Sequence, residues 1–458
     1  MKVKCVTLGC KTNKYESNAM EQSFKKHGYE IVSEKDEVPD IYIVNTCSVT
    51  NVAERKSRQM LRKVKEVNPQ AIVIACGCYV QVAKEEIEKI DEVDIVLGIN
   101  EKNNIVNIVE EYIQNKNKVV KVEDVMHESS FHDFGTTTYT EQTRAVVKIQ
   151  DGCDRFCTYC IIPYARGKVR SREPQSIIEE IKKISEKGLK EVIITGIHIA
   201  SYGKDFNNEK TLEYRKLYNY KNEFEKFNPK DDLHSGGFRL IELLEQINKI
   251  EGIERIRLGS IEPKLINKEW VMRVSKLKKI CHHFHLSLQS GCDETLMRMN
   301  RRYSTEEFAE SVKILRKYYD DVILTTDVIV GFPGETNEEF NTTYEFLKRI
   351  KFYKMHVFKY SLRRGTKAKK MPNQVDGKIK EIRSKKLIEL SNINQKNYDQ
   401  LMIGKTVKVL FEEREGEYYK GHTENYIMIR AKTDRNLENK ILDVKIKEMS
   451  NNELIVIL

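Results

Sequence analysis

The chain has 458 residues, too many for one ordinary domain, and this length predicts two or three domains. Its 79 Lys and Arg residues outnumber 69 Asp and Glu residues, and the formal net charge of +10 permits a nucleic-acid partner without requiring one. No apolar run is long enough to cross a bilayer and no signal peptide precedes the first predicted strand, so we expect a cytoplasmic protein with no membrane partner. In a reducing cytoplasm, ten cysteines favour metal ligation over disulfides.

The first 115 residues alternate predicted strands with predicted helices, a rhythm typical of a small parallel α/β domain. Strands are expected at the apolar runs 3–8, 41–44, 71–75 and 95–98. Helices are expected at 16–27, 52–67, 83–90 and 104–115. The helix over 52–67 is basic and ends at Asn68-Pro69.

Three cysteines of this domain, Cys10, Cys47 and Cys78, each follow the end of a predicted strand. Ligands gather at the carboxyl edge of an open parallel sheet, so these thiols are candidates to bind a metal cluster together. The alternative is that each is a small buried hydrophobic residue, but three at one edge favour ligation. Cys76 lies two residues before Cys78, and in an extended strand both would point to one face. Strand alternation therefore permits either as the third ligand.

Residues 116–138 are polar and lack periodicity, and we predict a linker there. From 139 to 376 a longer alternation of six strands with helices fits an incomplete (β/α)6 barrel. Its strands are expected at 145–150, 191–195, 255–260, 284–289, 322–330 and 354–360. Its helices are expected at 174–186, 240–250, 268–277, 305–319 and 337–350.

Directly after the first barrel strand, three cysteines form a C-x3-C-x2-C pattern, namely Cys153, Cys157 and Cys160. Three thiolates can hold three irons of a [4Fe–4S] cube and leave the fourth iron open to the amino and carboxylate groups of a small molecule. The spacing, with Tyr159 before the last cysteine, resembles that of the radical S-adenosylmethionine (SAM) enzymes. A zinc knuckle or buried free thiols are the alternatives, but His198, the nearest downstream histidine, has no second CxxC beside it.

Further Gly-rich and polar stretches follow other barrel strands, at the edge where barrel enzymes place their chemistry. Glycine lets a ligand approach the backbone closely, and a carboxylate accepts hydrogen bonds from hydroxyl or amino groups. Together these stretches predict contacts to the amino group, ribose and adenine of SAM. The candidate SAM-binding residues are Gly196, Ser260, Glu262, Gln289, Gly331 and Glu335.

Two segments stand apart from the barrel pattern. Residues 204–238 are rich in Lys, Asn, Asp, Tyr and Glu, and we predict a mobile surface insertion that contributes no core element, although its interleaved Tyr and Lys could touch RNA. A long charged helix is expected from about 377 to 400, and the all-β pattern of 397–458 predicts a small β-barrel. Such a barrel is either a single-stranded nucleic-acid module or a purely structural one.

Over essentially its whole length the chain resembles the radical SAM methylthiotransferases. The motifs that carry the resemblance lie at residues 8–13, 45–50, 77–81, 151–160, 286–291 and 327–336. The resemblance implies an N-terminal methylthiotransferase domain over 1–115, a radical SAM core over 139–376 and a TRAM domain over 397–458. It also implies that Cys78, not Cys76, completes the auxiliary cluster site with Cys10 and Cys47.

Within the family, residues 51–59 and 358–366 are most similar to the branch that modifies N6-threonylcarbamoyladenosine at tRNA position 37, beside the anticodon. The resemblance implies SAM and two [4Fe–4S] clusters, an auxiliary one and one that binds SAM. A SAM-derived radical would abstract hydrogen from adenine C2, and sulfur and methyl would then be delivered to that carbon. The implied partners are the anticodon stem-loop of tRNA and a reductant such as flavodoxin or ferredoxin. No side chain is expected to be catalytic, because the cofactors carry this chemistry.

Two other functions stay open. The first is the same chemistry on isopentenyladenosine in tRNA or on a ribosomal protein, of which the protein substrate is disfavoured by the N-terminal motif variants. The second is a non-enzymatic iron–sulfur sensor that binds RNA. A sensor needs no SAM site, so the barrel and the stretch from Gly331 to Thr336 argue against it.

Overall fold

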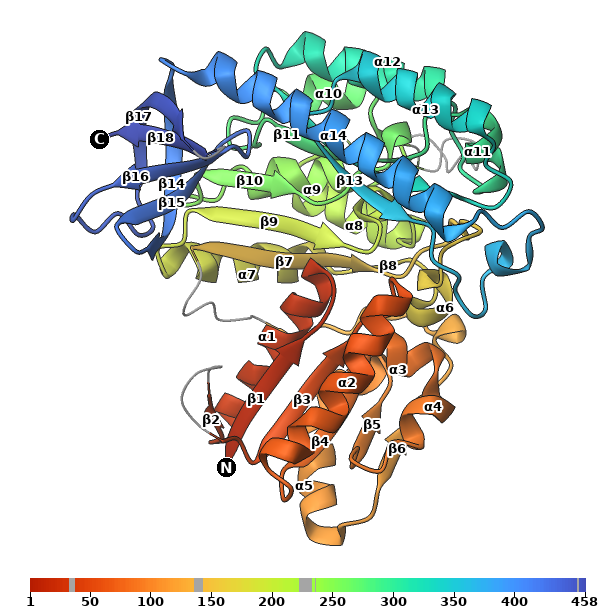
Figure 1. The fold of residues 1–458 in the computed structure, drawn as a ribbon. Coiled ribbons are helices and arrows are strands. Elements are labelled where there is room, and N and C mark those ends of the chain that lie inside the picture. The colour runs from red at the N-terminus through yellow and green to blue at the C-terminus, as the bar shows by residue number, and fades with distance from the viewer. Residues whose placement is uncertain (33–37, 136–142, 222–232, 235, 451–452) are drawn as a thin grey trace.

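The computed structural model describes residues 1–32, 38–135, 143–221, 233–234, 236–450 and 453–458. Figure 1 shows an N-terminal α/β region in red and orange, a larger central α/β region, and a small blue β-barrel at the C-terminus. The predicted fold class is confirmed, with parallel sheets followed by a closed C-terminal barrel. Within the described residues, no helix has the length and apolar character needed to cross a bilayer.

Six parallel strands form the N-terminal sheet in the order β2-β1-β3-β4-β5-β6. They are β1 (Lys2–Thr7), β2 (Glu30–Ile31), β3 (Ile41–Thr46), β4 (Ile72–Gly77), β5 (Ile95–Leu97) and β6 (Val119–Lys121). Every residue of β3 and β4 is buried, as expected for parallel strands covered on both faces. The covering helices are α1 (Lys11–Lys26) and α5 (Ile105–Asn115) on one face, and α2 (Asn51–Val67), α3 (Cys78–Val82) and α4 (Lys84–Glu88) on the other.

The range predicted as a linker, 116–138, is partly built into the fold, which corrects that prediction. Its residues Val119–Lys121 are strand β6, which pairs with β5. The short 3-10 helix η2 (Val125–His127) buries Val125, and Asp133 pairs with Arg172 of the central region at 2.8 Å. Strands of two or three residues, such as β2 and β6, are too short to show a period-2 pattern. Residues 136–138 lie outside the described part of the chain.

The central region contains the six parallel strands of the predicted incomplete barrel. One sheet holds β7 (Arg144–Asp151), β9 (Glu191–Gly196) and β10 (Arg255–Leu258) with the short antiparallel β8 (Arg170–Ser171), and a second holds β11 (His283–Gln289), β12 (Ile323–Val330) and β13 (Lys354–Lys359). Parallel bridges from Ile256 to Ile280 and from Ile261 to Leu286 connect the two sheets. Among the described residues no pairing joins β13 to β7, so the barrel is open between them.

Helices and 3-10 turns follow the barrel strands. They are α6 (Ile162–Arg166), α7 (Pro174–Glu186), η3 (Ile199–Ser201), α8 (Asn208–Leu217), α9 (Leu240–Ile247), η5 (Pro263–Leu265), α10 (Lys268–Val274), α11 (Asp293–Arg298), α12 (Thr305–Tyr318) and α13 (Asn337–Ile350). Helix α12 begins with a capping box of Ser304 and Glu307, and α13 with one of Thr336 and Glu339. These caps satisfy backbone N–H groups that the helices leave unpaired at their N-termini.

The segment 204–238 does contribute to the core, so the prediction of an insertion without a core element is wrong for its described part. Phe206, Tyr214 and Phe238 are buried in the barrel core, and Tyr214 packs on the other two with ring centroids 5.1 and 5.7 Å apart. The segment carries no aliphatic periodicity because widely spaced aromatic rings do the anchoring instead. Residues 222–232 and 235 lie outside the described structure.

The long helix α14 (Gly377–Met402) leads into the C-terminal barrel, whose strand order is β14-β15-β16-β18-β17. Its strands are β14 (Thr406–Glu415), β15 (Tyr418–Thr423), β16 (Met428–Lys432), β17 (Ile441–Ser450) and β18 (Glu453–Ile457). Arg255 of β10 donates to the carbonyls of His422 and Lys408 at 2.9 and 2.8 Å. The buried Arg257 donates to the Glu424 carbonyl at 3.2 Å. The C-terminal barrel is therefore docked on the central sheet.

Candidate active site between two cysteine triads

Cys10, Cys47 and Cys78, called here the N-terminal triad, lie at the carboxyl edge of three adjacent strands. Cys10 follows β1 and precedes α1, Cys47 follows β3 directly, and Cys78 is the first residue of α3 after β4. Because β1, β3 and β4 are neighbours in the sheet, residues distant in sequence meet at one edge. The structure thus brings together the three residues that the strand-end pattern singled out.

One buried amide joins the segments of this triad. The Nδ2 group of Asn13 donates to the carbonyls of Leu8 and Thr46 at 2.8 and 3.0 Å. Its Oδ1 accepts from Nη2 of Arg166 at 2.8 Å, and Nε of the same arginine lies 3.3 Å from Sγ of Cys78. Asn13 therefore fixes the ends of β1 and β3 relative to the guanidinium beside the third cysteine.

Two glycines permit this close approach of strand ends. Gly77 has a φ of +100°, and a Cβ atom there would lie 2.4 Å from the carbonyl oxygen of Thr46. A Cβ atom on Gly9 would lie 2.9 Å from Sγ of Cys47. A larger residue at either position would clash with atoms at the end of the neighbouring strand.

The environment of Cys76 differs from that of Cys78. Cys76 is fully buried in the hydrophobic core beneath α1, in a cluster that includes Met20 and Ile43. The strand ends at Gly77, so the alternation that would place both thiols on one face stops between them. This placement favours Cys78 as the third ligand.

Cys153, Cys157 and Cys160, called here the loop triad, lie on one loop after β7. Backbone N–H groups of Cys153 and Cys160 donate to the carbonyls of Gly167 and Cys157 at 3.0 and 2.9 Å. Gly152 has a φ of +72°, and a Cβ atom there would lie 1.6 Å from the Lys168 carbonyl oxygen, so the loop can turn only with glycine at this position. Contacts to distant residues hold the same loop, since the Thr158 N–H donates to the Met299 carbonyl at 3.0 Å.

Each triad has one arginine directed at a thiol. Nη1 of Arg301 lies 3.2 Å from Sγ of Cys157, matching the contact of Arg166 with Cys78. Cations and hydrogen-bond donors at a sulfur favour the thiolate that iron requires. The sequence reasoning missed both arginines. Arg166 at least sits on the short helix that follows the loop triad, whereas nothing near Arg301 in the sequence signals its role.

The thiols suit a cluster better than a single ion. Burial raises the pKa of Cys47 to about 11 and that of Cys153 to about 12, so ligation has to displace their protons. A structural zinc ion takes four protein ligands, whereas three thiolates hold a [4Fe–4S] cube and leave one iron open. Three cysteines with a cationic donor in each triad fit that larger group.

Glu262 lies at the centre of a charged cluster above the loop triad. It pairs with Nε of Arg155 at 3.0 Å and accepts from Nε2 of His198. Although burial raises its pKa, His198 and Arg155 hold the pKa of this carboxyl well below its usual range. Glu262 is therefore an anion beside the cysteine loop, able to accept hydrogen bonds from hydroxyl or ammonium groups.

The other predicted SAM-binding residues also lie at strand ends, with different surroundings. Gly196 ends β9, where a Cβ atom would lie 2.9 Å from the Gln150 carbonyl oxygen, and Gln289 ends β11 with a left-handed φ of 72°. Ser260 is exposed just after β10. These residues share the barrel edge at which the loop triad leaves β7.

Gly331 and Glu335 belong to one loop after β12. The Gly331 N–H donates to Oε1 of Glu335 at 3.0 Å, and the same oxygen pairs with Nη1 of Arg383 at 2.5 Å. The Glu335 carboxylate thus holds its own loop against α14. The Phe332 ring of this loop packs edge to face on Tyr159, with centroids 6.4 Å apart, and so connects the loop to the loop triad.

Arg363 lies between the two triads. Burial lowers its pKa, while the Glu54 carboxylate and the thiols of Cys47 and Cys160 oppose that shift, so the guanidinium is within electrostatic range of one thiol from each triad. Nη1 lies 3.1 Å from Oδ1 of Asn51 and 3.2 Å from Oε1 of Glu54. Its Nη2 atom is buried and has no hydrogen-bond partner within the described structure.

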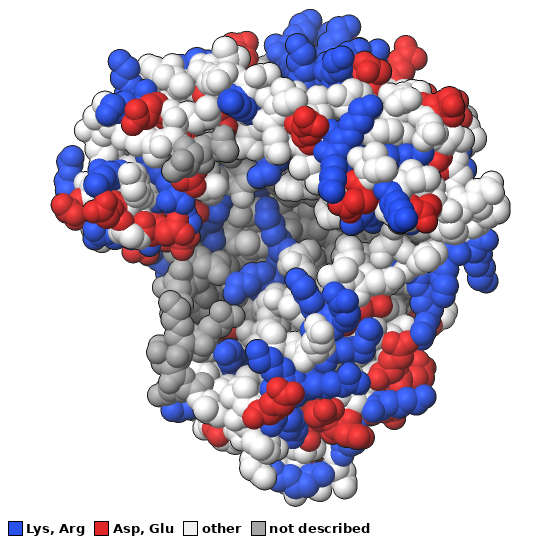
Figure 2. Space-filling view, in the orientation of Figure 1, with Lys and Arg blue, Asp and Glu red and all other residues white. Residues whose placement is uncertain are grey.

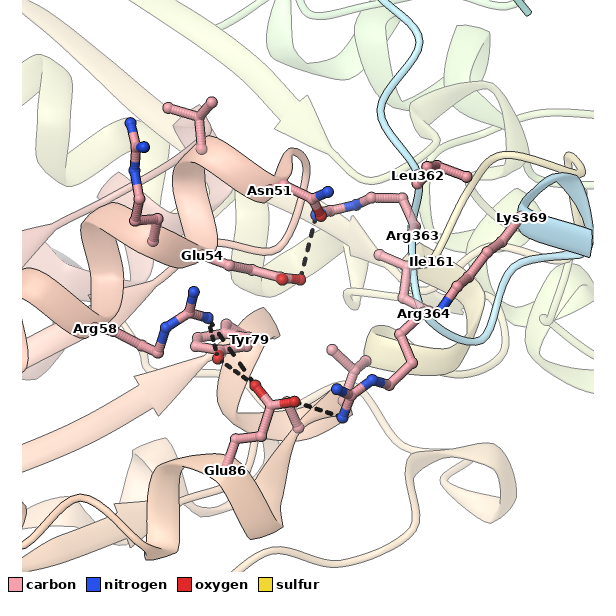
Figure 3. Close-up of a pocket in the computed structure, with 14 residues that line it drawn as sticks. Asn51, Glu54, Arg58, Tyr79, Glu86, Ile161, Leu362, Arg363, Arg364 and Lys369 are labelled. Atoms are coloured by element: carbon pink, nitrogen blue, oxygen red, sulfur yellow. Dashed lines mark hydrogen bonds and ion pairs between the residues drawn. The ribbon is translucent and has the colours of Figure 1, made fainter. Parts of the chain in front are cut away.

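Arg363 lines a cavity of about 560 Å³, called here the basic cavity, between the N-terminal and central regions. Figure 3 shows side chains from α2, α3, α4 and the loop after β13 around it. Three residues of the wall lie close in sequence to cysteines of the two triads. Ile161 directly follows Cys160, Tyr79 directly follows Cys78, and Asn51 lies four residues after Cys47. The cavity therefore opens beside both sets of cysteines.

Basic side chains gather around a hollow on one face of the molecule. In Figure 2 the surface is hollowed between the N-terminal region below and the central region and C-terminal barrel above, and Lys and Arg line much of the hollow. Helix α2 carries the basic residues Arg55, Lys56, Arg58, Arg62 and Lys63, of which Arg55 and Arg58 line the basic cavity. Such a surface attracts the phosphates of a nucleic acid.

Comparison with known proteins adds the following. Residues 147–347 match the radical SAM superfamily, and residues 2–98 match an uncharacterized protein family, UPF0004. The threonylcarbamoyladenosine tRNA methylthiotransferase MtaB of Bacillus subtilis is 37% identical over 445 residues, which cover 96% of this chain and 92% of that protein. The protein of the same name from Aquifex aeolicus is 40% identical over 430 residues, covering 94% and 96%.

More distant relatives and solved structures agree with these matches. The tRNA-2-methylthio-N(6)-dimethylallyladenosine synthase of Caldicellulosiruptor saccharolyticus is 33% identical over 460 residues, covering 98% of this chain and 90% of that protein. The structure of the radical SAM methyltransferase TsrM from Kitasatospora setae, with cobalamin and a [4Fe–4S] cluster bound, matches with a TM-score of 0.54 at 13% identity, over 80% of this chain and 77% of that one. At that identity the likeness concerns the fold alone.

Proposed function

The chain belongs to the radical SAM methylthiotransferases, and from this premise we propose that its substrate is tRNA carrying N6-threonylcarbamoyladenosine beside the anticodon. The product is the 2-methylthio derivative at adenine C2. The choice of substrate is supported by the Bacillus and Aquifex relatives, at 37 and 40% identity, against 33% for the relative named for dimethylallyladenosine. The chain therefore matches the threonylcarbamoyl branch better along nearly its full length.

We assign the loop triad to the [4Fe–4S] cluster that binds SAM and the N-terminal triad to an auxiliary [4Fe–4S] cluster. When bound, SAM and these clusters would supply the radical that removes hydrogen from adenine C2 and the sulfur and methyl that replace it. Arg301 and Arg166 stabilise the thiolates of Cys157 and Cys78. Glu262 stays anionic near Cys153 and is placed to orient hydroxyl or ammonium groups of SAM.

The observation that carries the proposal is the position of Arg363 and the basic cavity. This arginine interacts electrostatically with Cys47 and Cys160, and the cavity that it lines has a wall formed in part by Tyr79 and Ile161, the residues that directly follow Cys78 and Cys160. A reaction that takes hydrogen from one carbon and gives sulfur to the same carbon needs both cofactor sites at one substrate atom. Two distant cysteine sites would not serve it.

Binding of tRNA is supported by the basic hollow and by the C-terminal barrel, which Arg255 and Arg257 fix on β10. Phosphate contacts made by this surface make affinity fall steeply with salt. An electron donor such as flavodoxin or ferredoxin would reduce the SAM-binding cluster.

The proposal is tested by mass spectrometry of tRNA nucleosides from a deletion strain. We expect 2-methylthio-N6-threonylcarbamoyladenosine to vanish and its unthiolated precursor to accumulate, and a plasmid copy of the gene to restore the product. Loss of 2-methylthio-isopentenyladenosine instead would leave the chemistry standing and overturn the substrate. An unchanged nucleoside profile would argue for the RNA-binding sensor.

A further inference from the structure

The wall of the basic cavity carries an excess of positive charge. Five of its fourteen lining residues are basic and two are acidic. The two acidic side chains are already engaged: Glu54 pairs with Arg363, while Glu86 pairs with Arg364 and Arg58 and accepts from the hydroxyl of Tyr79. Figure 3 shows these contacts around the cavity.

One donor in this wall is left over. The Arg363 side chain is only 4% exposed, and its Nη2 atom is buried without a hydrogen-bond partner among the described residues. A buried guanidinium donor without an acceptor costs free energy of about 1–3 kcal/mol, so such a group signals a ligand that completes it. The acceptor it lacks is an anionic or carbonyl oxygen.

We propose that the basic cavity is a carboxylate subsite that recognises the amino-acid substituent on N6 of the substrate adenine. This inference rests on the proposed function and names the residues that set its specificity. Threonine joined to adenine through its amino nitrogen and a carbamoyl group keeps a free carboxylate, whereas a dimethylallyl group is an uncharged hydrocarbon. Arg363 and Arg364, two neighbours on the loop after β13, present the guanidinium groups.

The location argues for the substituent over an RNA phosphate, which offers the same anionic oxygens. The wall of the cavity includes Ile161 and Tyr79, which directly follow Cys160 and Cys78, so an adenine held between the triads can reach the cavity with its N6 substituent. Arg363 is buried, as a subsite residue should be, whereas phosphate contacts belong to exposed side chains on the outer surface. Arg364 is 74% exposed and lies nearer the entrance.

The test measures binding of three anticodon stem-loops to the anaerobic, cluster-loaded enzyme by fluorescence anisotropy. The stem-loops carry adenine, N6-threonylcarbamoyladenine, or the same base with its carboxylate converted to a neutral carboxamide. We expect the wild-type protein to bind the carboxylate form about 10- to 150-fold more tightly than the carboxamide form, the range for a hydrogen bond to a charged group. Arg364→Gln and Arg363→Lys should bring this ratio close to one.

Arg62→Gln is the matched control, because Arg62 is exposed on basic helix α2 but does not line the cavity. It should weaken all three stem-loops alike and keep the ratio. A wild-type ratio near one, or an Arg364→Gln variant that weakens all three stem-loops equally, would show that the cavity binds phosphate or nothing. Iron content equal to that of the wild-type protein verifies that each variant is intact.

Turnover separates this inference from the proposed function. If threonylcarbamoyl-bearing tRNA is methylthiolated while the binding ratio is one, the subsite is wrong and the substrate stands. If only tRNA bearing dimethylallyladenosine is methylthiolated, the substrate itself is wrong.

Discussion

The loop triad and the N-terminal triad consist of the same three residues but are built by different means. Cys153, Cys157 and Cys160 share one loop, which turns at Gly152 and is held by backbone hydrogen bonds within the segment and to Met299 and Ala368. The N-terminal triad is collected from the ends of three strands and exists only when the sheet has formed. The first is therefore encoded by spacing and the second by topology.

The arginines beside the two triads also differ in the number of distant charged residues that they contact. Arg301 otherwise contacts the Ser287 carbonyl and Tyr303. Arg166 also pairs with the buried carboxylates of Glu16 and Asp151, which further bind the ammonium groups of Lys102 and Lys148. The N-terminal triad thus depends on an ionic network that joins α1, η1 (Asn100–Asn104), β7 and α6. The loop triad meets this network at its first turn, where the Gly152 N–H donates to Oδ1 of Asp151 at 2.8 Å, but its own arginine, Arg301, lies elsewhere.

The largest effect is expected from replacing all three cysteines of the loop triad by Ala. Reconstituted wild-type protein should hold about eight irons per chain and the variant about four, because the other triad has its own ligands. SAM cleavage should be abolished. Iron assay and electron paramagnetic resonance of the anaerobic protein measure both. Loss of all iron would show that the two sites are not independent.

Comparing Cys78→Ala with Cys76→Ala tests which of the two cysteines is the third ligand of the N-terminal triad. Cys78→Ala should halve the iron content and stop methylthiolation while SAM cleavage persists. Cys76→Ala should keep both clusters and lower the free energy of unfolding by about 1 kcal/mol, since it removes a small buried side chain from the core. The reverse result in iron content would show that the third ligand is Cys76.

Arg166→Gln tests the dependence on the ionic network. Removing this guanidinium leaves Glu16 and Asp151 with fewer counter-charges in a buried site, and breaking such a pair lowers the free energy of unfolding by about 3–5 kcal/mol. Urea denaturation under anaerobic conditions measures the loss. A loss below about 1 kcal/mol would contradict the proposed dependence.

The same network predicts a pH dependence. Although burial raises them, Arg166 and the neighbouring lysines hold the pKa values of Glu16 and Asp151 below their usual range. The stabilisation by these carboxylates is therefore present above the unfolded-state pKa of about 4 and is lost as pH falls through the folded-state values. Urea midpoints of the wild-type protein should fall with decreasing pH below about 5, and those of Arg166→Gln should fall less. Parallel curves would contradict this expectation.

Arg301→Gln should have the smallest effect. The variant should keep its iron, because the cysteines are intact. The reduction potential of the loop-triad cluster should become more negative, because a cation next to Cys157 is lost. A redox titration followed by electron paramagnetic resonance measures the potential, with the auxiliary cluster as internal control. A shift confined to the auxiliary cluster would reverse our assignment of the two sites.

The sequence predicted what local spacing and strand ends encode. The loop triad follows from the C-x3-C-x2-C pattern, and the convergence of Cys10, Cys47 and Cys78 follows from parallel strand order. Alternation could not decide between Cys76 and Cys78, because the strand ends at Gly77 between them.

Features that depend on tertiary contact were not predictable. The basic cavity joins residues near 51–58, 79–86, 161 and 362–369, and no pattern in any one segment signals the others. The sequence does not reveal that segment 204–238 joins the core, because Phe206, Tyr214 and Phe238 are too widely spaced to form a period, yet Tyr214 packs on both other rings. Strands β2 and β6 are too short for alternation to reveal.

The network around Arg166 also imposes an order on biosynthesis. A ribosome releases the N-terminal sheet first, with the three cysteines of the N-terminal triad, while Arg166 lies beyond the loop triad and emerges later. Until α6 docks, Glu16 lacks its guanidinium partner and Cys78 lacks its cation. The N-terminal triad is therefore completed only after β7 and the loop triad have been made. A prematurely terminated chain carries the cysteines of that site without the charge that completes it.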